Sequence, residues 1–303
     1  MTLEQQQEAK KGIFLAISAY TMWGVAPIYF KLLGHVSPLE ILSHRIIWSF
    51  FLLAGLLHFS HQWRHVVDIF QSKIKLGYLL ITALLIGGNW LIFIWAINAN
   101  HMLDASLGYY INPILNVFLG MLFLGERLRK LQWFAVLLAM IGVGIQLVIF
   151  GSLPVVALVL ATTFGLYGLL RKKVGVGAQS GLFIETLFLL PVAALYLFML
   201  ADTPTSHLSN NDWSLNLLLI SAGIITTLPL LCFTGAATRL KLSTLGFFQY
   251  IGPSLMFLLA VLVYGEAFSA DKAITFVFIW GALIAFSYDG LTYKRHTTRI
   301  VTE

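Results

Sequence analysis

The chain has 303 residues, of which 59% are hydrophobic and 11% are charged, and its formal net charge is +6. About 25% of the residues in a soluble domain are charged, so this composition excludes an ordinary soluble protein. The basic excess does not indicate a nucleic-acid partner, because the basic residues stand between long apolar segments.

Apolar segments of about 20 residues recur along the whole chain, and each is long enough to cross the roughly 30 Å hydrocarbon core of a bilayer. In chain order, we predict spans at residues 12–33, 38–59, 75–97, 103–124, 132–150, 153–170, 179–200, 214–236, 243–264 and 271–288. The sequence therefore predicts an all-α polytopic membrane protein with ten transmembrane helices. The longest connection, about 201–213, is too short for a soluble domain, so residues 1–303 are expected to form a single transmembrane domain.

The basic residues alternate from one connection to the next, which indicates the orientation of the chain. Two or three occur near each terminus and in every second connection: Lys10, Lys11, Arg64, Lys73, Lys75, Arg127, Arg129, Lys130, Arg171, Lys172, Lys173, Arg239, Lys241, Lys294, Arg295 and Arg299. The connections on the other side hold only Lys31 and Lys272. By the positive-inside rule, both termini are predicted to lie in the cytoplasm.

Two parts of the chain repeat one pattern. Residues 110–126 and 250–266 both read Tyr-Ile-x-Pro, then eleven further residues, then Gly-Glu, at a constant offset of 140. Residues 162–165 resemble residues 21–24 at an offset of 141. An internal duplication in a membrane protein is typical of transporters whose site lies between the two halves.

The duplication predicts two repeats, 12–150 and 153–288, with five helices each. Because five is an odd number, matching helices must cross the membrane in opposite directions. This is the inverted-repeat plan of many secondary transporters. A duplication that serves only to build a stable bundle is the alternative.

Polar side chains inside a span should face protein or water, because lipid offers no hydrogen-bond partners. In the fourth and ninth spans, small and amide-bearing residues recur on one face, and these faces either border a pathway or pack the two helices together. For the tryptophans, anchoring at the membrane interface is the alternative. The predicted substrate-pathway residues are Tyr20, Trp23, Arg45, Asn89, Trp95, Tyr109, Asn112, Gln249 and Tyr250.

Arg45 is the most unusual of these residues. It lies seven positions after Pro38, about 10 Å into the membrane at 1.5 Å per residue. An arginine there costs several kcal/mol unless it finds partners or its side chain extends back to the interface, and the sequence leaves both open. Glu185 matches His44 in the other repeat. It either carries a coupling proton or pairs with the basic cluster 171–173.

Four more residues join His44 and Glu185 in a predicted coupling or gating set. Pro113 and Pro253 each remove a backbone hydrogen bond near the middle of a span and permit a kink. Glu126 and Glu266 follow glycines that close their helices, and we expect them to brace the next turn or a neighbouring helix end.

The spans contain no paired carboxylates at depth and no metal-binding motif such as His-Glu-x-x-His. We therefore predict no catalytic residues, no metal and no cofactor, and the partners are a small-molecule substrate and the lipid bilayer. A membrane-embedded enzyme acting on a lipid or interfacial substrate is the first alternative to a transporter, and a receptor or scaffold is the second. The oligomeric state is open, with a homodimer among the options.

Four runs of residues resemble one transporter family. They are 42–49 (Leu-Ser-His-Arg-Ile-Ile-Trp-Ser), 87–91 (Gly-Gly-Asn-Trp-Leu), 106–113 (Ser-Leu-Gly-Tyr-Tyr-Ile-Asn-Pro) and 245–253 (Leu-Gly-Phe-Phe-Gln-Tyr-Ile-Gly-Pro). Over nearly its whole length the chain resembles the RarD permeases, in the EamA-type branch of the drug/metabolite transporter superfamily.

The resemblance implies ten helices in two inverted repeats within a bacterial cytoplasmic membrane. It also implies a central cavity lined mainly by spans one, three, four, six, eight and nine, with spans five and ten at the periphery. The family name carries a link to chloramphenicol sensitivity, which does not define a physiological substrate. Together with the repeats, the resemblance favours a secondary permease that moves a small metabolite or drug-like solute by alternating access.

Overall fold

The computed structural model describes residues 3–98, 102–151, 155–263 and 270–302. In these residues the regular structure is entirely helical, as predicted. The elements are α1 (Leu3–Leu32), α2 (Pro38–Phe59), α3 (Trp63–Phe70), α4 (Lys73–Asn98), α5 (Met102–Leu124), α6 (Lys130–Phe150), α7 (Val155–Val174), α8 (Ala178–Leu195), the π-helical η1 (Tyr196–Leu200), α9 (Trp213–Arg239), α10 (Leu242–Gln249), α11 (Ile251–Leu258), the π-helical η2 (Leu259–Val263) and α12 (Ala270–Thr302).

Within the described ranges, eight helical segments are long and apolar enough to cross a membrane. Shorter apolar stretches, Gly108–Leu124 and Ala273–Asp289, lie in α5 and α12. Large apolar side chains such as Phe14, Leu122 and Val148 are exposed on the outside of the bundle. Lipid contact suits such a surface, whereas water does not. The prediction of a polytopic membrane protein is therefore confirmed, and the count of ten spans stays a prediction.

The predicted ninth span is broken in the middle. Pro253 has no backbone N–H, so the carbonyl of Gln249, one turn earlier, loses its helical partner. The chain breaks at Tyr250, whose N–H bonds the carbonyl of Phe247 at 3.3 Å, and α11 begins at the next residue. In contrast, α5 runs as one helix through Pro113.

A short helix that the span prediction missed, α3, joins α2 to α4. It is too short to cross a membrane, and its sequence is amphipathic rather than apolar throughout. Val66 and Ile69 are buried, while Trp63 lies edge-on against Phe183 of α8 with a ring-centroid distance of 5.3 Å. These contacts attach the turn between α2 and α4 to the start of α8.

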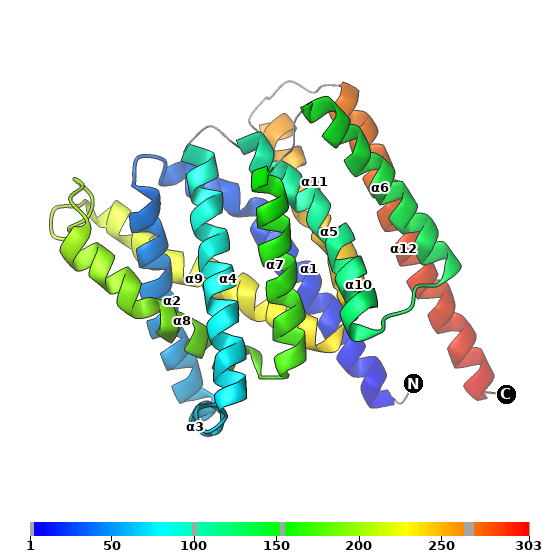
Figure 1. The fold of residues 1–303 in the computed structure, drawn as a ribbon, viewed down its shortest axis with the longest axis horizontal. Helices are drawn as coiled ribbons and strands as arrows, with labels where there is room; N and C mark the ends of the chain where they lie inside the picture. Colours follow the sequence, from blue (N-terminus) through cyan, green and yellow to red (C-terminus); the bar gives the residue numbers. More distant parts are fainter. Residues whose placement is uncertain (1–2, 99–101, 152–154, 264–269, 303) are drawn as a thin grey trace.

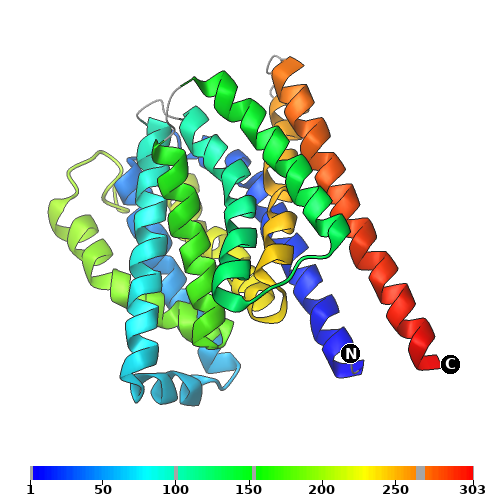
Figure 2. The ribbon, with the colours of Figure 1, turned by 45° about the vertical axis from the view of Figure 1, so that its right-hand side comes forward.

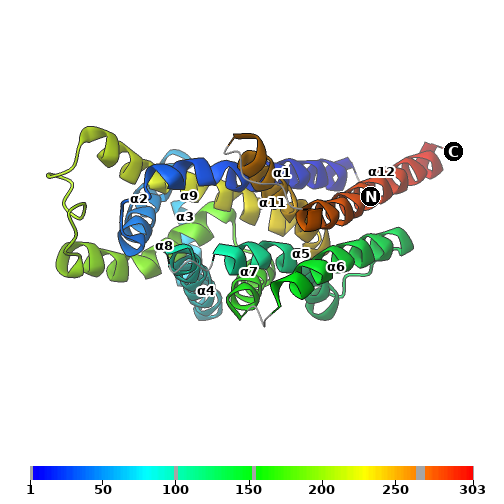
Figure 3. The same ribbon diagram turned by 90° about the horizontal axis from the view of Figure 1, so that it is seen from above.

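The helices form two layers (Figure 3). One layer contains α2, α9, α1, α11 and α12 in that order, and the other contains α8, α4, α7, α5 and α6. The layers meet where α2 packs against α8, where α10 packs against α5 and where α12 packs against α6. Contact across the middle, where α7 faces α9, is sparser than at these three places.

Both termini lie on the same side of the bundle in Figure 1 and in Figure 2. The same side holds α3 and the connections between α5 and α6, between α7 and α8, and between α9 and α10. These are the connections that carry most of the basic residues. The arrangement matches the predicted alternation, and the assignment of this side to the cytoplasm stays a prediction.

Reporter fusions test the orientation. Because the basic connections should remain in the cytoplasm, fusions after Phe70, Arg129 and Lys172 are expected to show cytoplasmic activity. A fusion near Ser206 should show activity on the outer side, measured with a paired phosphatase and fluorescent reporter. A cytoplasmic signal at Ser206 would contradict the ten-span topology.

Candidate functional site

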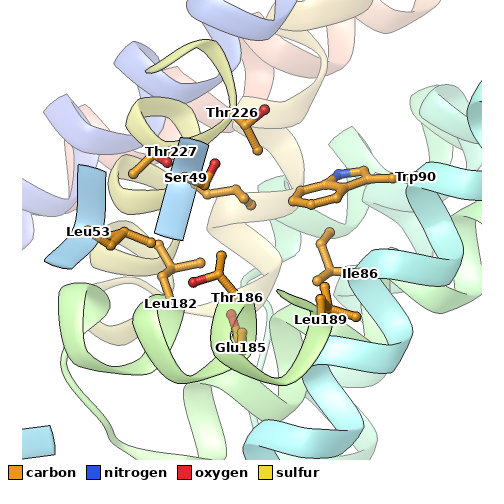
Figure 4. Close-up of a pocket in the computed structure, with 11 residues that line it drawn as sticks. Ser49, Leu53, Ile86, Trp90, Leu182, Glu185, Thr186, Leu189, Thr226 and Thr227 are labelled. Atoms are coloured by element: carbon orange, nitrogen blue, oxygen red, sulfur yellow. The ribbon is translucent and has the colours of Figure 1, made fainter. Parts of the chain in front are cut away.

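A narrow cavity lies between α2, α4, α8 and α9 (Figure 4). Its volume is ≈ 310 Å³ when space open to solvent is included, but the cavity has room for no more than about one water molecule. Hydroxyl, carboxylate and apolar groups share the wall, as a small amphipathic solute requires. The lining residues are Ser49, Leu53, Ile86, Trp90, Leu182, Glu185, Thr186, Leu189, Thr226, Thr227 and Leu230.

Arg45 of α2 lies at one edge of this cavity and is 7% exposed. Its Nε donates to Thr226 Oγ1 at 2.8 Å. Its guanidinium carbon lies 4.6 Å from the centre of the Trp90 ring and 5.5 Å from that of Phe30. Because these partners come from α9, α4 and α1, the side chain points into protein. It does not run along α2 towards the interface.

Glu185 lines the cavity on the side away from Thr226 in Figure 4, and it is paired. Arg171 Nε lies 3.7 Å from Glu185 Oε1, and the same oxygen accepts the Thr82 hydroxyl at 2.6 Å. Tyr167 donates its hydroxyl to Oε2 at 3.3 Å. Glu185 therefore belongs to a buried ion pair, and its hydrogen bonds help the protein to tolerate the buried charge. A role in proton coupling stays a prediction.

Aromatic side chains fill the space between α1, α7 and α9. Trp23 has ring-centroid distances of 5.7 Å to Tyr20, 5.7 Å to Phe164 and 5.8 Å to Phe233. Tyr167 stacks on Phe233 at 6.0 Å. Trp23 therefore packs in the interior of the bundle and does not act as an interfacial anchor.

The polar faces predicted on the fourth and ninth spans pack against each other. A Cβ at Gly246 would lie 2.8 Å from the Pro113 carbonyl oxygen, which shows how closely α10 approaches α5. Asn116 Nδ2 donates to Asn112 Oδ1 at 2.9 Å and to Gln249 Oε1 at 3.4 Å, and Asn112 donates to a carbonyl of α7 at 2.6 Å. In this conformation these residues serve helix packing, one of the two alternatives that the sequence left open.

The other predicted pathway residues lie in different places. Asn89 Nδ2 donates to a backbone carbonyl of α7 at 2.9 Å and so joins α4 to α7. The Tyr250 hydroxyl donates to a backbone carbonyl of α5 at 3.2 Å. Trp95 is 49% exposed on α4 and does not line the cavity. The structure therefore does not bring Asn89, Tyr250 and Trp95 together.

Two of the predicted gating residues need separate mention. His44 is buried, and its Nδ1 accepts from Trp48 Nε1 at 3.2 Å, while its Nε2 has no hydrogen-bond partner among the described residues. Glu266 lies outside the described residues.

Glu126 caps a neighbouring helix. Its carboxylate accepts the Leu242 and Ser243 N–H groups at 2.6 and 3.0 Å and the Ser243 hydroxyl at 2.7 Å. A carboxylate at this end of α10 satisfies unpaired N–H groups and complements the helix dipole. Lys172 of α7 donates in the same region to carbonyls at the C-terminal end of α9. These contacts tie α5 to α10 and α7 to α9 on the side that holds the termini.

The observed cavity differs from the one that the resemblance implied. It is lined by the second, third, seventh and eighth spans, whereas the first, fourth, sixth and ninth do not line it. Two packing features explain the difference. The aromatic cluster fills the space beside α1 and α7, and the amide contacts bring α5 against α10.

The sequence patterns did not single out Trp90 as a site residue, and they gave Arg171 only as part of the basic cluster 171–173 that was one alternative for Glu185. Trp90 follows Asn89 within one of the runs that resemble the RarD permeases, so a signal for it was present. No local pattern shows that Thr226 meets Arg45, because 181 positions separate them. Within the described ranges, no three His, Cys, Asp or Glu side chains gather into a metal site.

The comparisons with known proteins identify the family of the chain. The model of the EamA-like transporter family matches residues 10–148. An uncharacterized transporter of Vibrio cholerae is 76% identical over 286 residues, which cover 94% of this chain and 95% of the relative. Protein RarD of Salmonella typhimurium is 60% identical over 289 residues, which cover 95% of this chain and 98% of the relative. The chain belongs to the RarD family of EamA-type transporters.

This RarD-family fold also occurs in a solved crystal structure. That structure superposes with a TM-score of 0.71 and covers 90% of this chain and 96% of its own, at 18% sequence identity. The likeness supports the fold alone. The family and the relatives indicate a multi-pass transporter of bacterial membranes rather than an enzyme.

The Arg171–Glu185 pair predicts a pattern of stability in this RarD-family protein. Glu185→Gln should lower the free energy of unfolding by about 3–5 kcal/mol, because it leaves Arg171 buried without its counter-ion. The double variant Arg171→Leu/Glu185→Leu should recover most of this loss. Thermal unfolding of the purified proteins in detergent measures both effects. An unfolding temperature of Glu185→Gln equal to that of the wild type would show that the pair does not stabilise the fold.

Proposed function

We propose that this protein is a secondary-active permease that moves a small metabolite or drug-like solute by alternating access. It does so with ten transmembrane helices in two inverted five-helix repeats. The observation that carries the proposal is the narrow cavity between helices of the two layers. A cavity with a charged edge, buried inside a helical membrane protein of a transporter family, is suited to holding a polar solute away from lipid.

Contacts that recur in the two predicted repeats support the inverted arrangement. A Cβ at Gly24 of α1 would lie 2.8 Å from Leu255 Cβ of α11. The positions that match them by the sequence offsets are Gly165 of α7 and Leu115 of α5, and a Cβ at Gly165 would lie 3.1 Å from Leu115 Cδ2. The two layers also present the matching helices in the same order (Figure 3).

The extent of the family match supports the same division of the chain. The EamA-like transporter model covers residues 10–148, which nearly coincide with the predicted first repeat, 12–150. The predicted first repeat alone is thus similar to the segment that the family model describes. The second unit, 153–288, is proposed as its inverted partner on the offsets and contacts described above.

Alternating access requires contacts that can close each side in turn. On the side of the termini, Glu126 connects the two proposed repeats, and Lys172 connects the two layers through α7 and α9. On the opposite side, the Tyr29 hydroxyl donates to the Leu218 carbonyl at 2.7 Å, and Thr203 donates to Glu40 at 2.6 Å. Both sets are formed in this conformation. We propose that transport breaks one set at a time, in a bacterial inner membrane with both termini in the cytoplasm.

Flux into liposomes that contain only this protein tests the function. A panel of amino acids, nucleosides and chloramphenicol should include at least one solute that enters faster than it enters protein-free liposomes. Flux of none of them above the protein-free rate, with a folded protein, would count against a permease for these classes. Chemical conversion of a lipid or solute in the same liposomes would favour the membrane-embedded enzyme instead.

Arg45→Lys is expected to insert and fold normally but to lower this flux about tenfold, a loss of roughly 1.4 kcal/mol. Lysine keeps the charge but lacks the planar guanidinium group that lies over Trp90 and bonds Thr226. Arg127→Lys, in the exposed connection after α5, is the matched control and should transport like the wild type. Wild-type flux from well-expressed Arg45→Lys would assign Arg45 to packing alone.

A further inference from the structure

The charges around the cavity do not balance. Arg45 and Arg171 are permanent cations, because a guanidinium group is not deprotonated in proteins. Among the described residues, Glu185 is the only carboxylate on the cavity wall. It forms an ion pair with Arg171, whose Nε lies 3.7 Å from Glu185 Oε1. No carboxylate of the described residues lies within ion-pair distance of Arg45. The positive charge of Arg45 therefore has no ion-pair partner at the edge of the cavity where Arg45 bonds Thr226.

Among the described residues, the acidic residue of α2 forms no ion pair with Arg45. Glu40 precedes Arg45 by five positions, which is about 7.5 Å along the helix axis. Its Oε2 accepts the hydroxyls of Thr203 and Thr205 at 2.6 and 3.0 Å, in the connection between α8 and α9. Glu40 is therefore directed to that connection.

Hydrogen-bond donors collect at the Arg45 edge. Arg45 donates only through Nε, to Thr226, within the described residues, which leaves its two terminal nitrogens as donors for a ligand. Thr227 lines the cavity at 1% exposure, and its hydroxyl has no partner in the described part of the chain. Among the described residues, the Ser49 hydroxyl donates only to the Gly223 carbonyl oxygen, at the long distance of 3.3 Å. A buried hydroxyl without a partner is costly, so Thr227 points to a ligand or water at this place.

The rest of the wall is apolar. Leu53, Ile86, Leu189 and Leu230 face the cavity together with the indole of Trp90. A ligand that fits this wall needs an apolar part, and a ligand that fits the Arg45 edge needs an acceptor with negative charge. The guanidinium fork matches carboxylates and phosphates. Of these two groups the carboxylate is the smaller, and it suits the narrow cavity better.

We propose that the substrate is an amphipathic organic anion whose carboxylate binds Arg45, Thr227 and Ser49 and whose apolar part packs on the leucine side of the cavity. This inference rests on the proposed transport function and narrows its substrate class. A cation is disfavoured, because the one carboxylate that the described residues place on the wall, Glu185, is already paired with Arg171.

Charged thiol reagents measure the sign of the charge in the cavity without a known substrate. Thr186→Cys places one thiol on the cavity wall in a Cys232→Ala background, which removes the only native cysteine. Its reaction rates are compared for methanethiosulfonates that carry a sulfonate, a trimethylammonium or no charge. The ratio of the sulfonate to the trimethylammonium rate should fall about tenfold on Arg45→Gln, because even a unit charge about 10 Å away in an effective dielectric of about 20 has an effect of at least this size.

Arg127→Gln is the matched control, since it removes a positive charge from an exposed connection and should leave the ratio unchanged. An unchanged ratio in Arg45→Gln, or a wild-type preference for the trimethylammonium reagent, would overturn the inference.

Protection experiments test the substrate class directly. 3-Phenylpropionate should slow labelling of Thr186→Cys by the uncharged reagent, and the neutral 3-phenylpropanamide should protect at least about tenfold less well by concentration. Arg45→Gln should remove this difference. Equal protection by the acid and the amide, or stronger protection by 3-phenylpropylamine, would contradict an anion site.

Flux measurements separate this inference from the transport proposal. Flux of neutral or cationic solutes that is unaffected by Arg45→Gln would overturn the anion inference and leave transport intact. Arg45-dependent protection by 3-phenylpropionate without flux of any tested solute would support the anion site and count against a permease.

Discussion

One constraint dominates this structure: a charge buried among membrane helices must find its partners within the protein, because lipid supplies none. The two buried arginines meet this constraint in different ways. Arg171 forms an ion pair with Glu185, and hydroxyls from two helices complete the environment of that carboxylate. Arg45 has a hydroxyl and aromatic faces instead. The first arrangement is electrically complete, and the second leaves a charge that a solute can neutralise.

The surrounding contacts explain why the cavity is so small. Aromatic rings from α1, α7 and α9 occupy the space that other helices would otherwise border. On the side of the termini, Glu126 caps the start of α10 at Leu242 and Ser243 and so holds the first helix of the ninth span against the end of α5. The break near Pro253 lies at the other end of α10.

The sequence predicted the helical membrane fold well, because hydropathy and helix length are local properties. The sequence predicted that Pro113 and Pro253 permit kinks, but only the ninth span is broken, whereas α5 continues through Pro113. The partners of Arg45 could not be predicted, since Thr226, Trp90 and Phe30 come from three other helices. In this conformation Asn116 bonds Gln249, so the polar faces of the fourth and ninth spans pack together, and their part in a substrate pathway stays a prediction. Small and amide-bearing residues produce the same sequence pattern whether they face a neighbouring helix or water.

Alternating access requires that α5 and α10 separate on the side of the termini during transport. Cysteines at Arg127 and Lys241, in the Cys232→Ala background, lie next to the contact between Glu126 and the start of α10. A short cleavable crosslinker between them should stop flux in liposomes, and cleavage of the linker should restore it, while each single-cysteine variant transports normally with the same reagent. Wild-type flux from fully crosslinked protein would contradict alternating access through this side.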